Sequence, residues 1–89
     1  MIHVKLSRSQ MAGEAWVEVG FDVVCTARLL RAGGEIMVDL IETAPAFRRM
    51  GHASSLVRAL RERTGLRVVP VGVLDTPEAR AFWRSLGLA

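Results

Sequence analysis

The stretch from Pro45 to Ala53, PAFRRMGHA, most constrains how this chain folds, because it joins a strand pattern to a helix pattern without a long linker. The first turn of a helix leaves about four backbone N–H groups without intrahelical partners and carries roughly half a positive charge. Arg48 and Arg49 add fixed charge beside that turn, and Gly51 has no Cβ to block a close approach. These features predict an anion-binding loop at the start of a helix.

The composition is that of one globular domain, which we place at residues 1–89, with 51% hydrophobic residues and no low-complexity segment. A domain of this size buries only a little over ~60% of its unfolded surface, so its stability is expected to be modest. The single cysteine, Cys25, excludes an internal disulfide, and no Cys and His residues stand at metal-ligand spacing. We therefore expect no metal, and we expect a homo-oligomer, a dimer for example, or a partner chain to support the fold.

Hydropathy and charge limit which cellular compartment and which binding partners we expect. No apolar run approaches the ~18 residues that a membrane span needs, and the N-terminus does not resemble a signal, so we expect a cytoplasmic protein with no membrane association. The formal net charge is +3, and Lys5 is the only lysine. Nucleic-acid binding is not expected, because the arginines are scattered through every element rather than gathered on one face: Arg8, Arg28, Arg31, Arg48, Arg58, Arg67 and Arg84.

The N-terminal third of the chain carries strand patterns. Residues Ile2 to Leu6 alternate apolar and polar side chains, which predicts a short strand. Residues Ser7 to Glu14 are small or polar and predict a loop. From Trp16 to Arg31 the chain is rich in residues that favour strands, with a break at residues 20–22, so we predict a hairpin of two strands.

A second hairpin leads into the predicted anion loop. Residues 32–34, Ala-Gly-Gly, favour a tight turn, so the strands on either side should be antiparallel neighbours. The strand after the turn runs from Glu35 to Thr43. Strict alternation would place Ile36, Val38 and Leu40 on its buried face, and Glu35, Met37, Asp39 and Ile41 on the other.

A helix should begin near Gly51 and end at Gly65, with an apolar stripe formed by Ala53, Leu56, Val57 and Leu60. Residues Leu66 to Leu74 then predict a Val-rich strand, and a strand-helix-strand unit of this length calls for a right-handed parallel crossover. Pro70 donates no ladder bond, so this strand should lie at an edge or diverge from its neighbour.

A second helix has clear boundaries. Thr76 is a good N-cap, Pro77 suits the first helical position, and Gly87 favours a stop. Apolar side chains at helical spacing lie between them, at Ala79, Phe82, Trp83 and Leu86. Together the elements predict an α/β (α+β) fold, in which a mixed, mostly antiparallel sheet contains one parallel strand-helix-strand crossover and is followed by a C-terminal helix.

The order of these elements and two motifs resemble the GNAT superfamily of N-acetyltransferases. The family's acetyl-CoA signature is Arg or Gln, two free positions, Gly, one free position, then Gly or Ala, and RRMGHA at residues 48–53 matches every constrained position. The segment EARAFWRSLGL at residues 78–88 is similar to a later segment of the family, with its aromatic pair and its Leu-Gly-apolar ending. The resemblance covers roughly residues 15–88 and implies a short member of the family.

The resemblance implies acetyl-CoA as co-substrate and an amine, whose identity the sequence does not reveal, as acceptor. The pyrophosphate would bind at Arg48 to Ser54, mainly to the main-chain N–H groups of Arg49, Met50, Gly51, His52, Ala53 and Ser54. The pantetheine arm would lie in a gap between diverging strands, bonded like an extra strand to the main chain of Ile41, Glu42 and Thr43. An ordinary strand-to-helix turn is the alternative interpretation of the loop.

The residues that would catalyse the reaction are less clearly indicated than those that would bind the cofactor. The amine would attack the thioester directly, with Asp39 as general base and Glu35 on the same predicted face as a second candidate. Both carboxylates also fit solvated or ion-paired positions on a strand. His52 in the loop could have a chemical role, but we interpret it as a solvent-facing side chain. Cys25 in a Val-rich strand could be an acyl-accepting thiol, but we interpret it as a small core residue.

Two departures from the family favour a second hypothesis. The family often uses a tyrosine of its C-terminal helix to protonate the departing thiolate, whereas this chain has no tyrosine and carries Trp83 in the aromatic pair. An indole cannot serve as that acid. The helices that usually wall the acceptor pocket are missing too, so the alternative is a catalytically silent GNAT-like module that binds a protein, with or without CoA.

Overall fold

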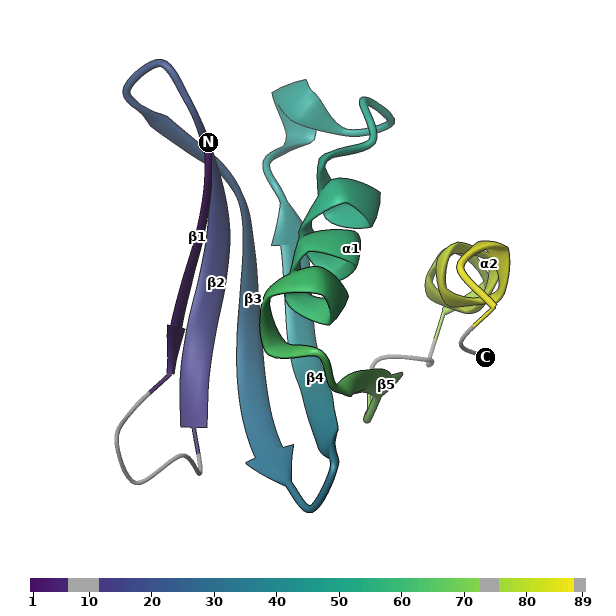
Figure 1. Cartoon of the computed structure of the whole chain (residues 1–89). Coiled ribbons are helices and arrows are strands. Elements are labelled where there is room, and N and C mark those ends of the chain that lie inside the picture. Colours follow the sequence, from purple (N-terminus) through teal and green to yellow (C-terminus); the bar gives the residue numbers. More distant parts are fainter. Residues whose placement is uncertain (7–11, 73–75, 88–89) are drawn as a thin grey trace.

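The computed structural model describes residues 1–6, 12–72 and 76–87 as one mixed sheet with two α-helices (Figure 1). The strands lie in the order β1-β2-β3-β4-β5. Neighbouring strands are antiparallel except for β4 and β5, which are parallel. This arrangement confirms the predicted fold class. The elements are β1 (Ile2–Leu6), β2 (Ala12–Val19), β3 (Asp22–Ala32), β4 (Glu35–Thr43), a 3₁₀ turn η1 (Pro45–Phe47), α1 (His52–Thr64), β5 (Arg67–Pro70) and α2 (Pro77–Ser85).

The two predicted hairpins are both present. β2 and β3 meet at the turn around Gly20, and β3 and β4 meet at Gly33, which has the left-handed φ of 59° that such a turn requires. One boundary was predicted wrongly, because Ala12 to Glu14 are the first residues of β2 rather than the end of a loop. These residues pair with β3 from Leu30 to Arg28, so cross-strand bonding outweighs their weak strand propensity. The rest of that predicted loop, residues 7–11, lies outside the described residues.

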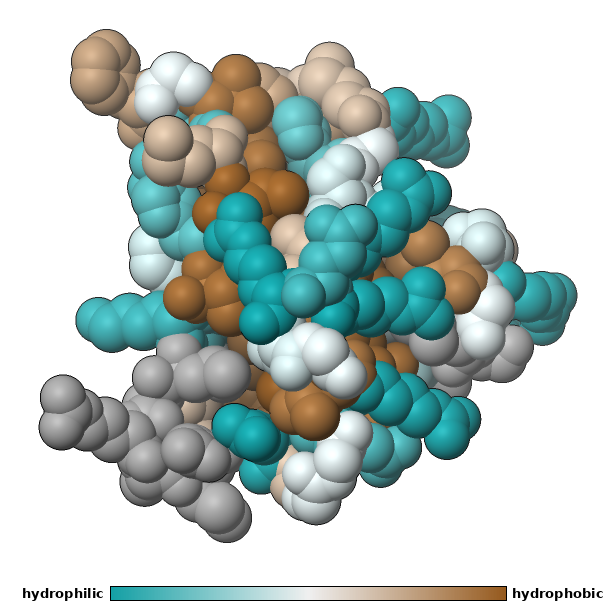
Figure 2. All heavy atoms as spheres, viewed as in Figure 1, coloured by the Kyte–Doolittle hydropathy of each residue, from teal (hydrophilic) through white to brown (hydrophobic). Residues whose placement is uncertain are grey.

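The helix α1 covers one face of the sheet (Figure 1). Its apolar stripe is buried as predicted, with Leu56, Val57 and Leu60 all inaccessible to solvent and Ala53 half-buried. Both ends are left-handed glycines, Gly51 before the helix and Gly65 after it. The opposite side of α1 carries charged residues, and Figure 2 shows hydrophilic side chains gathered over the helix with hydrophobic residues beside it. The core lies between this stripe and the sheet: Ala15, Val17, Val24, Cys25, Ala27, Leu29, Ile36, Val38, Val68 and, from α2, Trp83.

The last strand is shorter than predicted. β5 ends at Pro70, whereas the sequence suggested a strand as far as Leu74, and residues 73–75 lie outside the described residues. Val71 N still donates to Val38 O at 2.9 Å, and the chain then bends at Gly72, which has a left-handed φ of 69°. The following helix begins as predicted, because Thr76 Oγ1 accepts a hydrogen bond from Ala79 N at 3.1 Å. In the described part of the chain, no helix has the length and apolar character that crossing a bilayer requires.

β4 contains a β-bulge, so the predicted assignment of its side chains to the two faces of the sheet is wrong beyond the bulge. Arg28 of β3 pairs with Leu40 and Leu29 pairs with Val38, so Asp39 is an extra residue without a cross-strand partner. The extra residue reverses the alternation beyond it. As a result Ile41 packs against the core, and Leu40, which strict alternation placed on the buried face, points to the other face beside Arg28.

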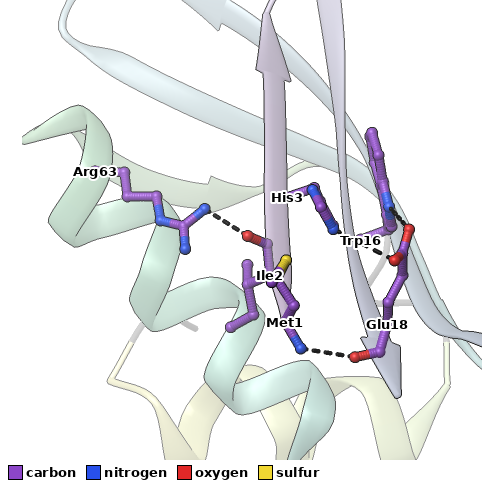
Figure 3. A network of polar contacts seen from close by, with 6 residues as sticks. All are labelled: Met1, Ile2, His3, Trp16, Glu18 and Arg63. Carbon is purple, nitrogen blue, oxygen red and sulfur yellow. Dashed lines mark hydrogen bonds and ion pairs between the residues drawn. The ribbon is translucent and has the colours of Figure 1, made fainter. Parts of the chain in front are cut away.

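On the face of the sheet away from α1, a polar cluster joins β1 to β2 (Figure 3). The rings of His3 and Trp16 are stacked at 5.1 Å. Trp16 Nε1 donates to Glu18 Oε1 at 2.9 Å, and Glu18 Oε2 lies 3.5 Å from His3 Nε2, an ion pair when the imidazole is protonated. At the edge of the sheet, Arg63 Nη1 of α1 donates to the Ile2 carbonyl at 2.7 Å. The first strand is therefore attached both to its neighbour and to the helix.

Candidate functional site

A cleft of about 1080 Å³ opens where β5 turns away from β4. Its walls come from the ends of β3 and β4, the loop before α1, the first turn of α1, and α2. The last bond between the diverging strands runs from Val71 N to Val38 O at 2.9 Å. β4 continues from Asp39 to Thr43, and among the described residues no strand pairs with it on that side. The predicted divergence at the Pro70 strand is therefore present.

Main-chain groups of β4 face this cleft. Ala44 N donates to Val24 O of β3 at 2.9 Å, whereas Thr43 O accepts a bond from Arg48 Nε at 3.3 Å on the opposite edge. Because main-chain groups alternate in direction along a strand, those of Ile41 point to the same open edge as those of Thr43. Those of Glu42 point towards β3, although Glu42 also lines the cleft. The free edge thus offers donors and acceptors in the pattern that an added strand would use.

The loop before α1 brings a helix N-terminus to the outer end of the cleft. The first intrahelical bond runs from Ser55 N to Gly51 O at 2.9 Å, so the N–H groups of His52, Ala53 and Ser54 precede the hydrogen-bonded ladder. Among the described residues, no side chain caps this end of the helix, and the first turn itself contains no acidic residue. It therefore presents donors and the positive end of the helix dipole, as an anion site requires.

Backbone geometry in the loop is unusual at two positions. Gly51 has a φ of 82°, which is readily available to glycine. Arg49 has a φ of 64°, which costs free energy for a residue with a side chain and is a finding that the sequence did not predict. Arg48, Arg49 and Ala53 line the cleft. Met50, Gly51, His52 and Ser54 stand beside it in the loop and helix start, and the Met50 side chain is exposed.

The two candidate carboxylates lie in different places. Asp39 lines the cleft at the bulge, and Arg28 Nε donates to both of its carboxylate oxygens at 3.0 Å. This bond raises the pKa of the exposed Arg28 guanidinium above its ordinary value. Glu35 begins β4 at the far end of the strand, where its Oε2 lies 3.8 Å from Arg67 Nε. The structure therefore brings Asp39, but not Glu35, to the cleft, and it reveals an arginine partner that sequence reasoning missed.

Cys25 lies in the wall of the cleft and is 1% exposed. Burial raises the pKa of its thiol, and a hydrogen bond from Thr43 Oγ1 at 3.5 Å acts in the opposite direction with a smaller effect. The thiol is therefore held in its neutral, weakly nucleophilic form, as expected for a small core residue. Within the described ranges, no group of three His, Cys, Asp or Glu residues gathers as a metal site would require.

Sequence reasoning did not assign site residues to α2, yet this helix forms one wall of the cleft through Thr76, Glu78, Ala79, Phe82 and Trp83. The side chain of Trp83 is fully buried, and the Phe82 ring meets it edge to face with centroids 5.2 Å apart. The signal in the sequence was an adjacent aromatic pair within a series of apolar residues at helical spacing, Ala79, Phe82, Trp83 and Leu86. That pattern also describes an ordinary core helix, so it does not by itself indicate a site.

Comparison with known proteins supports the fold assignment. The sequence matches no family model and no curated protein. A GNAT-family acetyltransferase from Streptococcus pneumoniae TIGR4 has a similar structure, with a TM-score of 0.74 and 20% identity over 100% of this chain and 88% of that protein. The ribosomal-protein-alanine N-acetyltransferase from Brucella melitensis biovar Abortus 2308 gives a TM-score of 0.73 at 16% identity over 89% of this chain.

A third similar structure is the aminoglycoside N-acetyltransferase AAC(6')-Iy in complex with CoA, with a TM-score of 0.74 and 13% identity, covering 89% of this chain and 69% of that protein. The chain spans 64% of the length of the Brucella protein. These likenesses show that the chain has the GNAT fold, as the resemblance in sequence implied.

Proposed function

We propose that the protein is an acetyltransferase that moves an acetyl group from acetyl-CoA to an amine by direct attack. The observation that carries this proposal is the continuity of the cleft, which runs along the free edge of β4 from Asp39 to the uncapped N-terminus of α1. A long ligand with a phosphate at one end and amide groups along its length matches both parts. The CoA complex of AAC(6')-Iy adds support through the shared fold.

The residues present fit such a ligand. The helix start offers the N–H groups of His52, Ala53 and Ser54 to phosphate oxygens, and Arg48 and Arg49 add charge at the rim of the cleft. The left-handed Gly51 exposes its backbone without a Cβ. The main-chain groups of Ile41 and Thr43 would bond an extended arm in the manner of an added strand. Glu42 also lines the cleft and would contact this arm, whereas Met50 belongs to the loop that would hold the phosphates.

The bound co-substrate would supply an activated acetyl thioester. The chain contributes positioning, because holding the amine against the thioester replaces a bimolecular encounter. Main-chain N–H groups at the free edge of β4 would polarise the carbonyl. As the new C–N bond forms, the C–S bond of the thioester would break, and the CoA thiolate would leave and take a proton from water. Asp39 would accept the proton of the amine, directly or through water, once its carboxylate is released from Arg28. Glu35 remains a weaker candidate, because it lies at the opposite end of β4.

A test of this proposal measures thermal stability with acetyl-CoA, CoA and a duplex DNA as the control polyanion. A ligand that binds only the folded state at ~100 times its dissociation constant stabilises it by ~2.7 kcal/mol. We expect both forms of the coenzyme to raise the melting temperature and DNA to leave it unchanged. The absence of a shift with either coenzyme at millimolar concentration would exclude the proposal.

A second candidate function is a silent GNAT-like module that binds a protein, with or without CoA. The bond from Arg28 to both oxygens of Asp39 favours it, because a carboxylate held in this way is less available as a base. Thiol release from acetyl-CoA with a panel of amines distinguishes the two. In the enzyme, Asp39→Asn should lower thiol release at least tenfold without a change in CoA affinity, and Glu35→Gln serves as the matched control. A wild type that binds CoA but releases no thiol supports the silent module.

Oligomerisation stays a prediction. The edge strands of the sheet are β1 and β5, and Arg63 already occupies one outward carbonyl of β1. We propose that a second copy or a partner chain covers an edge, as edge strands generally require. Sedimentation equilibrium at micromolar concentration measures this, and a monomer mass throughout would contradict it.

A further inference from the structure

A second pocket, of about 520 Å³, adjoins the cleft, and we call it the side pocket. Its lining includes Lys5, Glu14 and Arg28, which are cross-strand neighbours on the far face of the sheet, the face away from α1. Thr26 and Leu40 line both the side pocket and the cleft. The two hollows therefore meet at these two residues.

The ion pair between Arg28 and Asp39 joins the two hollows. Arg28 lines the side pocket, Asp39 lines the cleft, and Arg28 Nε donates to both carboxylate oxygens at 3.0 Å. The Arg28 side chain is 63% exposed and the Asp39 side chain 25% exposed, so a ligand can reach both. A guanidinium has five N–H donors, and the bonds found within the described ranges use only the one on Nε. The donors on the Nη atoms are available to a second carboxylate.

This ion pair is suited to exchange. It shares one N–H between two oxygens, whereas the strongest arginine–carboxylate pairs use two parallel N–H bonds. An ion pair that is exposed to solvent adds little to stability, so opening it costs little. A lone cation that bound Asp39 would nevertheless leave Arg28 without its partner. A ligand that carries both a cation and an anion can replace both halves of the pair at once.

The charges around the pair also favour a ligand with both signs. Lys5 and Arg28 bring positive charge to the side pocket, and Glu14 brings negative charge. Asp39 balances these charges from the cleft, so the site matches a zwitterion better than a simple cation. Arg28 Nε and the Asp39 oxygens are only 3.0 Å apart, so the two charged groups of the ligand have to be close together. The amine and the carboxylate of an α-amino acid meet this requirement.

We infer that the amine acceptor is a free α-amino acid, whose carboxylate binds Arg28 while its amino group faces Asp39. The inference rests on the proposed function, to which it adds a substrate class and a substrate-binding residue. It also supplies the event that releases Asp39, because the carboxylate of the substrate takes the place of Asp39 on the guanidinium. The base therefore becomes available only when an acceptor of this class is bound.

Acetyl transfer to an amino acid removes two protons from its ammonium group. One proton passes to solvent, and the nitrogen lone pair then attacks the carbonyl carbon of the thioester. As the N–C bond forms, the C–S bond breaks, and the second proton passes to Asp39. The CoA thiolate takes a proton from water, and the hydroxide left behind recovers the proton from Asp39. The N-acetyl product has no positive charge at nitrogen, so Asp39 can return to Arg28.

The test compares each common amino acid with its primary amide as acceptor for the full chain, with acetyl-CoA as donor and release of the CoA thiol as the readout. The amide keeps the amine and the side chain and removes the carboxylate. Amidation also leaves more of the amine neutral near pH 7, so amine reactivity by itself would favour the amide. We expect at least one amino acid to give a kcat/KM about 10- to 100-fold above that of its amide, the range for one hydrogen bond to a charged group.

Variants of Arg28 link this preference to one side chain. Arg28→Gln should bring the kcat/KM of the amino acid down to that of its amide. Arg28→Lys should restore part of the difference, because it keeps the charge and loses the planar fork. Arg67→Gln is the matched control and should keep the full preference, since Arg67 is also an exposed arginine beside a carboxylate, that of Glu35, but lies at the other end of β4.

Other outcomes overturn the inference. If the amides react as fast as the amino acids, or if Arg28→Gln keeps the preference, the inference is wrong and the proposed function stands. If acetyl-CoA raises the melting temperature but no acceptor of either kind releases thiol, the inference is wrong and the silent module is supported. If neither coenzyme shifts the melting temperature at millimolar concentration, both the inference and the proposed function fail.

Discussion

The two tryptophans lie in contrasting environments on opposite faces of one sheet. Trp16 is half-buried, its ring stacks on His3, and its Nε1 donates to Glu18. The chain itself therefore supplies contacts for both the ring and the indole N–H. Trp83 is fully buried and packed with the core, it belongs to the wall of the cleft, and its Nε1 has no hydrogen-bond partner among the described residues. The contrast teaches that burial and hydrogen bonding are separate properties of a side chain, because the more deeply buried indole is the one whose N–H has no partner among the described residues.

The largest expected effect comes from removing each indole in turn. Trp83→Ala removes a fully buried ring and leaves a cavity, which typically costs about 3–5 kcal/mol of unfolding free energy. Trp16→Ala should cost clearly less, because its ring is only half-buried. Urea denaturation followed by circular dichroism measures both. Equal losses would remove the distinction between the two environments.

A smaller effect should follow from changing the backbone of the anion loop. Gly51→Ala places a side chain on a left-handed residue, which costs roughly 1–2 kcal/mol although no atom lies within 4 Å of the added Cβ. Gly34→Ala, at a turn position that also has open space and no left-handed φ, is the matched control and should be nearly neutral. Thermal denaturation compares the two variants, and acetyl-CoA affinity should fall only in the first.

The smallest effect is expected in the polar cluster of the far face. Glu18→Ala removes the acceptor of the Trp16 indole, but the pair is partly exposed, so water replaces the lost bond and the cost should stay below about 1 kcal/mol. The Trp16 indole signal should move and the Trp83 signal should not. A change in acetyl-CoA affinity in this variant would mean that the two faces are coupled.

Local signals in the sequence were sufficient for most of the fold. The glycines at 51 and 65 predicted both ends of α1, and Thr76 followed by Pro77 predicted the start of α2. The Gly33 turn predicted the hairpin that leads to the cleft. These signals work because a cap or a tight turn is formed by residues that are neighbours in sequence.

The candidate site was predictable only in part. Residues 48–54 and the strand end at residues 41–43 were assigned from the motif, and the structure places them around one loop and one free strand edge. The bulge at Asp39, its bond to Arg28 and the early end of β5 were not foreseen. Each depends on pairing between strands, and the alternation of a single strand does not reveal an inserted residue.

By itself the sequence determined the order of the elements, the loop that starts α1 and the resemblance to GNAT acetyltransferases, because these depend on residue types at short fixed spacings. Only the tertiary structure decided that Asp39 faces an arginine, and that Trp83 is buried in the wall of the cleft with no hydrogen-bond partner for its Nε1 in the described part of the chain. Contacts between Arg28 and Asp39, or between α2 and the sheet, arise when distant segments pack together. The physical reason is that a hydrogen-bond partner, or the lack of one, is a property of the space around an atom rather than of its neighbours in the chain.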